Sequence, residues 1–144
     1  MVSVRTIILS DQGIFKFYNE DVERSCKPTL LMIHGFGGSA CLFYMIFKQL
    51  LEHFRIVAID MLGFGASTRV TIKDSVLSSP AATENYHVSW LQAWLNQMSL
   101  NQEMPEKFFL HGHSYGGFIS SLFACANPDR IEALFLNSAI GAET

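Results

Sequence analysis

Residues 107–118 read Lys-Phe-Phe-Leu-His-Gly-His-Ser-Tyr-Gly-Gly-Phe, and this segment is the most informative about the fold. Lys107–Leu110 is a short apolar run, which predicts a strand buried on both faces of a sheet. Tyr115–Ala126 is apolar on nearly every side, which predicts a buried helix. The chain must turn sharply at Ser114, and the small residues Gly112 and Gly116 let strand and helix approach without Cβ clashes. The sequence therefore predicts a strand–turn–helix unit that exposes one serine.

The same alternation of apolar runs and helical periodicities extends outward from this unit. The predicted buried strands are Thr29–His34, Arg55–Asp60, Lys107–Leu110 and Ile131–Asn137. Apolar residues recur at helical spacing over Phe43–Leu51 and Tyr86–Met98. This order is typical of an α/β fold, in which helices flank a mostly parallel central sheet.

The segments between these elements predict turns, a helix cap and a helix breaker. Ser3–Leu9 and Ile14–Tyr18 flank a turn signal and predict a hairpin at the start of the chain. Ser39 is expected to cap a helix, and Pro80 is expected to break one within a polar loop over residues 68–82. Because no repeat or linker interrupts the pattern, we expect one domain over residues 1–144, with its last strand as an exposed apolar edge.

A second glycine-rich turn, His34-Gly35-Phe36-Gly37-Gly38, directly follows the first central strand. An oxyanion hole needs two main-chain N–H donors, one from the residue after the nucleophile and one from such an upstream loop. The sequence thus predicts donors at Tyr115 and Phe36. The alternative is a helix-entrance turn that binds nothing.

A third turn, Asp60-Met61-Leu62-Gly63-Phe64-Gly65-Ala66-Ser67, contains the first two glycines of a dinucleotide-binding pattern. Thr68 occupies the position of the third glycine and no helical pattern follows, so a dinucleotide site is excluded. Asp60 is instead expected to accept hydrogen bonds from main-chain amides of this turn.

Charge and composition exclude several classes of partner. The net charge is −3, and the ten Lys and Arg residues form no cluster, which argues against binding nucleic acid. No apolar run approaches the ~18 residues that span a bilayer, although contact with a membrane surface or lipid droplet stays open. Three cysteines without metal-ligand spacing favour reduced thiols in the cytoplasm. No cofactor is expected.

The five histidines do not form a metal site, since none has a partner at ligand spacing. His113 is next to Ser114 in sequence, so we expect its side chain to point away from the serine and to be packed and hydrogen-bonded rather than act as its base. His53 and His87 are expected to be exposed on helices. Trp90, Trp94 and Tyr86 are expected to pack in the core or under a lid.

Three ordered motifs, His34–Gly38, Asp60–Ser67 and Gly112–Gly117, make the chain resemble the α/β-hydrolases of the fold-1 type over nearly its whole length. The sequences of these motifs are most similar to those of the lysophospholipase and lipase co-activator branch, which handles acyl-phospholipids and lipid droplets. Some members of that branch have asparagine in place of the serine, whereas this chain keeps Ser114. The resemblance implies the N-terminal portion of the fold, without its last strands and lid.

By this resemblance, Ser114 is the nucleophile, the Phe36 and Tyr115 amides form the oxyanion hole, and Gly35, Gly37 and His113 border the substrate. The family places its catalytic acid and histidine after later strands, which this chain is expected to lack. A minority places the acid after the fourth central strand, where Glu143 stands.

Two functions from different classes stay open. The first is a serine hydrolase that cleaves carboxylic esters, with acyl lipids as the narrower substrate class, through an acyl-Ser114 intermediate. The second is a catalytically inactive, truncated hydrolase fold that binds a lipid or a protein and is prone to self-association through its exposed strand. Acyl transfer to an alcohol ranks last, because no His-x-x-x-x-Asp signature is present.

Overall fold

A single five-stranded sheet organises the part of the chain that the computed structural model describes, residues 3–9 and 27–141. The strands are β1 (Thr6–Leu9), β2 (Thr29–Ile33), β3 (Arg55–Ile59), β4 (Phe108–His113) and β5 (Ile131–Asn137). The helices are α1 (Tyr44–Leu50), α2 (Pro80–Leu100) and α3 (Tyr115–Ala126). Short 3-10 segments are η1 (Ala40–Phe43), η2 (Asp74–Val76) and η3 (Pro128–Arg130).

The sheet is mostly parallel, as the sequence predicts. Its strand order is β1-β3-β2-β4-β5, in which β2 pairs in parallel with β3 and β4, and β4 pairs in parallel with β5. β1 pairs antiparallel with β3 at one edge. The expected hairpin partner of β1, Ile14–Tyr18, lies outside the described residues. Parallel strands bring their carboxyl ends to one edge, so the turns after β2, β3 and β4 gather there.

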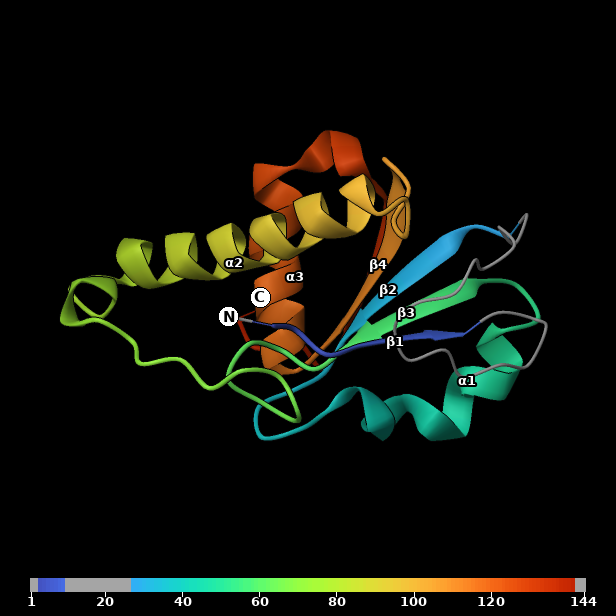
Figure 1. Cartoon of the computed structure of the whole chain (residues 1–144), viewed down its shortest axis with the longest axis horizontal. Helices are drawn as coiled ribbons and strands as arrows, with labels where there is room; N and C mark the ends of the chain where they lie inside the picture. Colours follow the sequence, from blue (N-terminus) through green and yellow to red (C-terminus); the bar gives the residue numbers. More distant parts are fainter. Residues whose placement is uncertain (1–2, 10–26, 142–144) are drawn as a thin grey trace.

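Helices cover both faces of the sheet (Figure 1). Successive residues of a strand point to opposite faces, so β2 and β3 supply two separate cores. Leu31 and Val57 belong to the core under α2 and α3, whereas Met32 and Ala58 belong to the core under η1 and α1. This arrangement explains why both strands are apolar at consecutive positions.

The start of α2 differs from the sequence expectation. Pro80 is the first residue of the helix rather than a breaker, and Ser79 caps it by accepting a hydrogen bond from the Ala82 main-chain nitrogen at 3.2 Å. A proline fits the first helical position because its missing N–H would have no partner inside the helix. Ser39 makes no side-chain cap, and a 3-10 segment rather than an α-helix follows it.

β5 forms the other edge of the sheet. Its residues Phe135 and Leu136 are 45% and 42% exposed, so apolar surface is open along this edge. Self-association through this edge stays a prediction. Among the helices of residues 3–9 and 27–141, none combines the length and apolarity needed to cross a membrane.

Candidate active site

Ser114 lies between β4 and α3 in a backbone conformation that few non-glycine residues adopt. Its φ is 52° and its ψ is −116°, and such a conformation persists only where the surroundings enforce it. The Ser114 N–H donates to the Asn137 carbonyl at 3.0 Å, and the Ser114 carbonyl accepts from the Phe118 and Ile140 nitrogens at 3.2 Å each. The last residue of β5 and the segment just after it therefore hold both the N–H and the carbonyl of Ser114 in place.

Glycines make this turn sterically feasible. A Cβ on Gly112 would overlap the Gly116 carbonyl oxygen, and a Cβ on Gly116 would overlap the carbonyls of Ile33 and His34. α3 therefore starts in direct contact with the main chain of β2. The small residues that the sequence places on either side of Ser114 are required by this approach.

The turn after β2 presents the second predicted oxyanion donor. The Gly38 N–H donates to the Gly35 carbonyl at 3.1 Å, and Gly37 has a φ of 70°, the left-handed conformation that such a turn needs at its third residue. Neither the Phe36 nor the Tyr115 main-chain N–H donates to any group in the described part of the chain. Two unpaired amides on adjoining loops are what an oxyanion hole requires.

An aromatic cluster borders these loops. The Phe36 ring contacts the Phe64 ring at a centroid distance of 5.3 Å and the Tyr115 ring at 6.3 Å. Tyr115 in turn stacks on Phe118 at 6.1 Å. Phe36 is 79% exposed, so this cluster offers an apolar surface beside Ser114 to a ligand.

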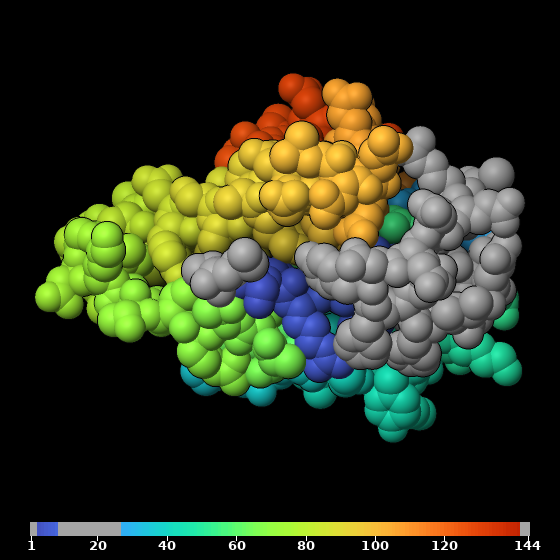
Figure 2. Space-filling view, in the orientation of Figure 1, coloured from blue at the N-terminus to red at the C-terminus, as the bar shows by residue number. Residues whose placement is uncertain are grey.

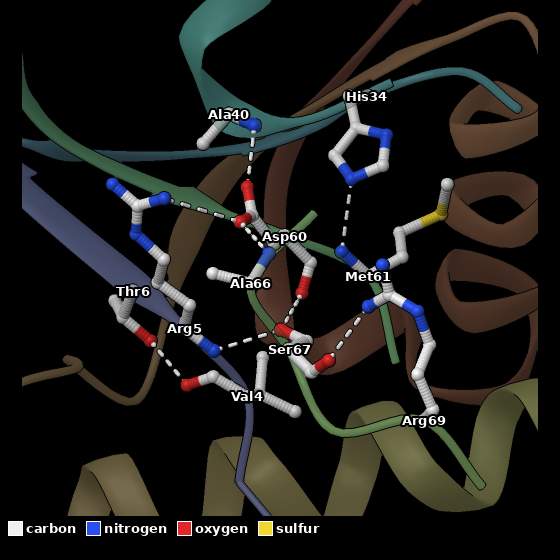
Figure 3. A network of polar contacts seen from close by, with 10 residues as sticks. All are labelled: Val4, Arg5, Thr6, His34, Ala40, Asp60, Met61, Ala66, Ser67 and Arg69. Carbon is white, nitrogen blue, oxygen red and sulfur yellow. Dashed lines mark hydrogen bonds and ion pairs between the residues drawn. The ribbon is translucent and has the colours of Figure 1, made fainter. Parts of the chain in front are cut away.

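Asp60 holds the turn after β3 against the turn after β2 (Figure 3). Its carboxylate is fully buried and accepts hydrogen bonds from the Ala40 nitrogen at 2.7 Å and the Ala66 nitrogen at 2.8 Å. The guanidinium of Arg5 lies 3.6 Å away. The sequence correctly assigns Asp60 to main-chain amides, although the Ala40 contact comes from η1 rather than from its own turn.

His34 joins the same network in a defined tautomer. The Met61 N–H donates to Nε2 of His34 at 2.9 Å, so Nε2 carries no proton. Nδ1 therefore carries the proton and donates to the Gly35 carbonyl at 2.7 Å. Burial lowers the pKa of His34, against the opposing effects of the Gly35 carbonyl and Asp60. His34 is a neutral link between two site loops.

Ser114 Oγ makes no hydrogen bond to any residue that the structure describes. The His113 side chain packs against Gly35, where an added Cβ would lie 3.0 Å from Nδ1 of His113. Contrary to the expectation, its imidazole makes no hydrogen bond within the described ranges. Gly35 and Gly37 lie in the turn after β2, and His113 directly precedes Ser114; contact of these residues with a substrate stays a prediction. Glu143 lies outside the described residues.

His87 is a buried side chain beside the candidate site that sequence reasoning placed on the surface. It is 9% exposed, not a surface residue, and its Nε2 lies 2.7 Å from the Tyr115 hydroxyl. Helical spacing offers a signal, because Leu91 and Leu95 follow His87 at intervals of four and are fully buried. Trp94 packs in the core as expected, and its indole N–H donates to the Thr6 hydroxyl at 3.2 Å.

The buried histidines predict a loss of stability in acid. Burial lowers the pKa of His34, His87 and His111, and His113 lowers that of His111 further. Between these lowered values and the unfolded value of about 6.5, the unfolded chain binds more protons, so the free energy of unfolding falls as pH decreases below about 6.5. Urea unfolding measured across this range checks the slope.

His111→Leu is expected to flatten that slope, because Nδ1 of His111 is buried without a hydrogen-bond partner beside the Phe43 ring. His53→Gln, a change at an exposed residue, should leave the slope as it is. An unchanged slope in the leucine variant would refute the assignment of His111.

A family model described as alpha/beta hydrolase fold matches residues 28–143. A "1-acylglycerol-3-phosphate O-acyltransferase" of Arabidopsis thaliana is 34% identical over 79% of this chain and 25% of its own length. A "(Lyso)-N-acylphosphatidylethanolamine lipase" of Homo sapiens is 30% identical over 92% of this chain and 36% of its own length. The chain therefore spans about a quarter to a third of these relatives.

Solved structures agree on the architecture. A 2-hydroxy-6-oxo-6-phenylhexa-2,4-dienoate hydrolase from Rhodococcus sp. strain RHA1 superposes with a TM-score of 0.65 at 25% identity. The match covers 82% of this chain and 40% of that hydrolase.

Among the described residues, no group of His, Cys, Asp and Glu could hold a metal ion.

Proposed function

The chain belongs to the α/β-hydrolase fold family, and we propose that its Ser114 is the nucleophile of a centre that cleaves carboxylic esters. The observation that carries this proposal is the strained backbone of Ser114 at the start of α3, next to two unpaired main-chain N–H groups. The positive φ alone does not distinguish Ser114, because Ser138 also has one. What distinguishes Ser114 is that α3 begins at the next residue, beside the unpaired Phe36 and Tyr115 N–H groups.

The proposed reaction has two halves. Ser114 Oγ attacks the carbonyl carbon of the ester while its proton passes to a general base. The carbonyl oxygen becomes an oxyanion, which the Phe36 and Tyr115 amides and the positive end of α3 stabilise. The bond to the leaving alcohol then breaks, the alcohol takes the proton, and an acyl-Ser114 ester remains. Water completes hydrolysis by attacking that ester, which restores the serine and releases the acid.

The substrate class follows from the surface beside the serine. The aromatic cluster of Phe36, Phe64, Tyr115 and Phe118 favours an apolar acyl chain, hence an acyl lipid. Relatives named as a lipase and as an acyltransferase both handle an acyl group. The acyl-Ser114 stage is common to hydrolysis and to transfer, so the proposal does not depend on the final acceptor. The cytoplasm, with contact at lipid surfaces, fits this substrate and the free thiols of Cys41 and Cys125.

The alternative of an inactive lipid- or protein-binding module rests on one observation. Ser114 Oγ has no base at hydrogen-bond distance in the described ranges. A serine without its base loses several orders of magnitude in rate but keeps the contribution of the oxyanion hole. The isolated chain is therefore expected to turn over esters poorly unless a soluble base is supplied.

Added imidazole tests the proposal on this chain. We expect a fluorophosphonate probe with an alkyl chain to label Ser114 at a rate that rises with imidazole concentration. Ser114→Ala should reduce labelling at least about tenfold, to the level of the unfolded chain. Mass spectrometry of the digested protein identifies the labelled residue.

Ser138 supplies a matched control. It follows β5 at the same edge of the sheet, is exposed, and also has a positive φ of 47°, but no helix starts after it. Ser138→Ala should label as the unchanged protein does. Equal labelling of the Ser114→Ala protein, or saturable lipid binding without Ser114-dependent labelling, would favour the binding module instead.

A further inference from the structure

A histidine on α2 connects that helix to the candidate site. His87 lies in the second turn of α2 and is 9% exposed. On one side the indole N–H of Trp90 donates to its Nδ1 at 3.3 Å, and on the other its Nε2 lies 2.7 Å from the Tyr115 hydroxyl. The His87 and Tyr115 rings also meet edge to face, with centroids 5.4 Å apart. Figure 2 shows α2, in yellow and yellow-green, as a ridge along the outside of the molecule.

The partner of Nδ1 determines where the imidazole proton is. An indole nitrogen is only a donor, so Nδ1 of His87 must be the acceptor and carries no proton. In the neutral ring Nε2 then carries the proton and donates to the Tyr115 oxygen. His87 thus accepts at one end and donates at the other, and both bonds form together only in this tautomer.

We propose that His87 is a positioning residue for Ser114 chemistry: in its neutral form it holds Tyr115 against α2, and its protonation loosens that hold. This inference rests on the proposed function, because Tyr115 matters as the residue whose main-chain N–H faces the oxyanion. The Tyr115 ring is held at its hydroxyl by His87 and along its faces by Phe118 and Phe36, which fixes the first turn of α3.

Protonation puts two donors face to face. A proton on Nδ1 of His87 would point at the Trp90 N–H, so the bond between them is lost and the buried ring carries an unpaired donor. The titratable groups in contact with His87 among the described residues are Tyr115 on α3 and Tyr86 on α2, and burial raises the pKa of both phenols, so both stay neutral. The carboxylates of Asp74 on η2 and Glu84 on α2 do not shift His87, whose pKa burial alone lowers.

Nuclear magnetic resonance tests the contact directly. The chain contains two tryptophans, and the indole N–H of Trp94 donates to the non-titrating hydroxyl of Thr6. In proton–nitrogen spectra from about pH 7.5 to about pH 5, the Trp90 indole signal should move in one transition that coincides with the His87 ring signals. The Trp94 signal should show no such transition. A Trp90 signal that ignores His87 would overturn the proposal.

His87→Gln tests the functional consequence. A glutamine amide can accept from Trp90 with its oxygen and donate to Tyr115 with its nitrogen, and it does not titrate in this range. We measure the rate at which the fluorophosphonate probe labels Ser114 in the presence of imidazole, for the unchanged protein and for His87→Gln. At each pH, the rate of the unchanged protein is divided by that of the variant. The ratio removes the pH dependence of imidazole itself and of the other histidines. The rate of the unchanged protein divided by that of the His87→Gln protein should be near one at neutral pH. It should fall at least threefold as the pH decreases from about 6.5 toward about 5, because only the unchanged protein carries a titrating group at this position.

His87→Leu, which can neither accept nor donate, should label slowly at every pH, whereas His53→Gln should keep a constant ratio. A constant ratio for His87→Gln, with Ser114-dependent labelling present, would overturn the positioning role and leave the proposed function standing. Loss of Ser114-dependent labelling in the unchanged protein would overturn both. Normal labelling by the leucine variant would also overturn the positioning role, provided circular dichroism shows that variant to be folded.

Discussion

Asp60→Ala is expected to lower the free energy of unfolding by about 3 kcal/mol, one of the two largest changes that a single side chain should produce here. The carboxylate is fully buried and accepts from the Ala40 and Ala66 amides. Charge-assisted hydrogen bonds contribute about 1.5–3 kcal/mol each, and the Ala40 amide is buried, so it would lose its partner without gaining water. The turns after β2 and β3 would separate.

Urea unfolding followed by circular dichroism measures this change. Asp74→Ala removes an exposed carboxylate and should alter stability by no more than about 0.5 kcal/mol. The loss of stability in Asp60→Asn should lie between those of Asp60→Ala and Asp74→Ala. An amide keeps one acceptor oxygen, but it turns an N–H₂ group toward the second main-chain donor. Equal stability of the Asp60→Ala and Asp74→Ala proteins would show that Asp60 does not hold the turns.

The expectations that the structure confirms depend on local patterns. Continuous apolar runs at 29–34 and 55–60 predict strands buried on both faces, and β2 and β3 are buried at every residue. The glycines around Ser114 predict a close approach of main chains, and Gly116 indeed meets β2. In each case, the residues of one short segment are enough to predict how that segment folds and how closely it is packed.

The expectation for Pro80 fails for a local reason, whereas the expectation for His87 fails because of a distant partner. Pro80 can end one helix or begin another, and only the cap at Ser79 decides between them. His87 is polar, and its burial depends on Tyr115, which lies 28 positions further along the chain. Periodicity places His87 on the same face as Leu91 and cannot show that α3 supplies a hydroxyl to it. For the same reason, the sequence predicts that Asp60 binds amides but not that η1 provides one of them.

Gly116→Ala is expected to destabilise the fold by about 2–3 kcal/mol, although the same change inside a helix usually stabilises by about 0.5–1 kcal/mol. The new Cβ would overlap the carbonyls of Ile33 and His34, which are main-chain atoms of β2 and of the turn after it. Neither can rotate away as a side chain would. α3 must therefore move away from the sheet, carrying the Tyr115 amide with it.

Gly63→Ala separates this overlap from ordinary backbone strain. Gly63 has a φ of 89° and open space around its Cβ position, so its alanine variant should lose only about 1–2 kcal/mol, from the left-handed conformation alone. It should also keep imidazole-dependent labelling of Ser114, whereas Gly116→Ala should lose it even under conditions where both proteins are folded. If Gly116→Ala instead stabilised the chain, α3 would not be pressed against β2. The strained conformation of Ser114 would then lack its structural cause, because the close contact between α3 and β2 is what makes the turn so sharp.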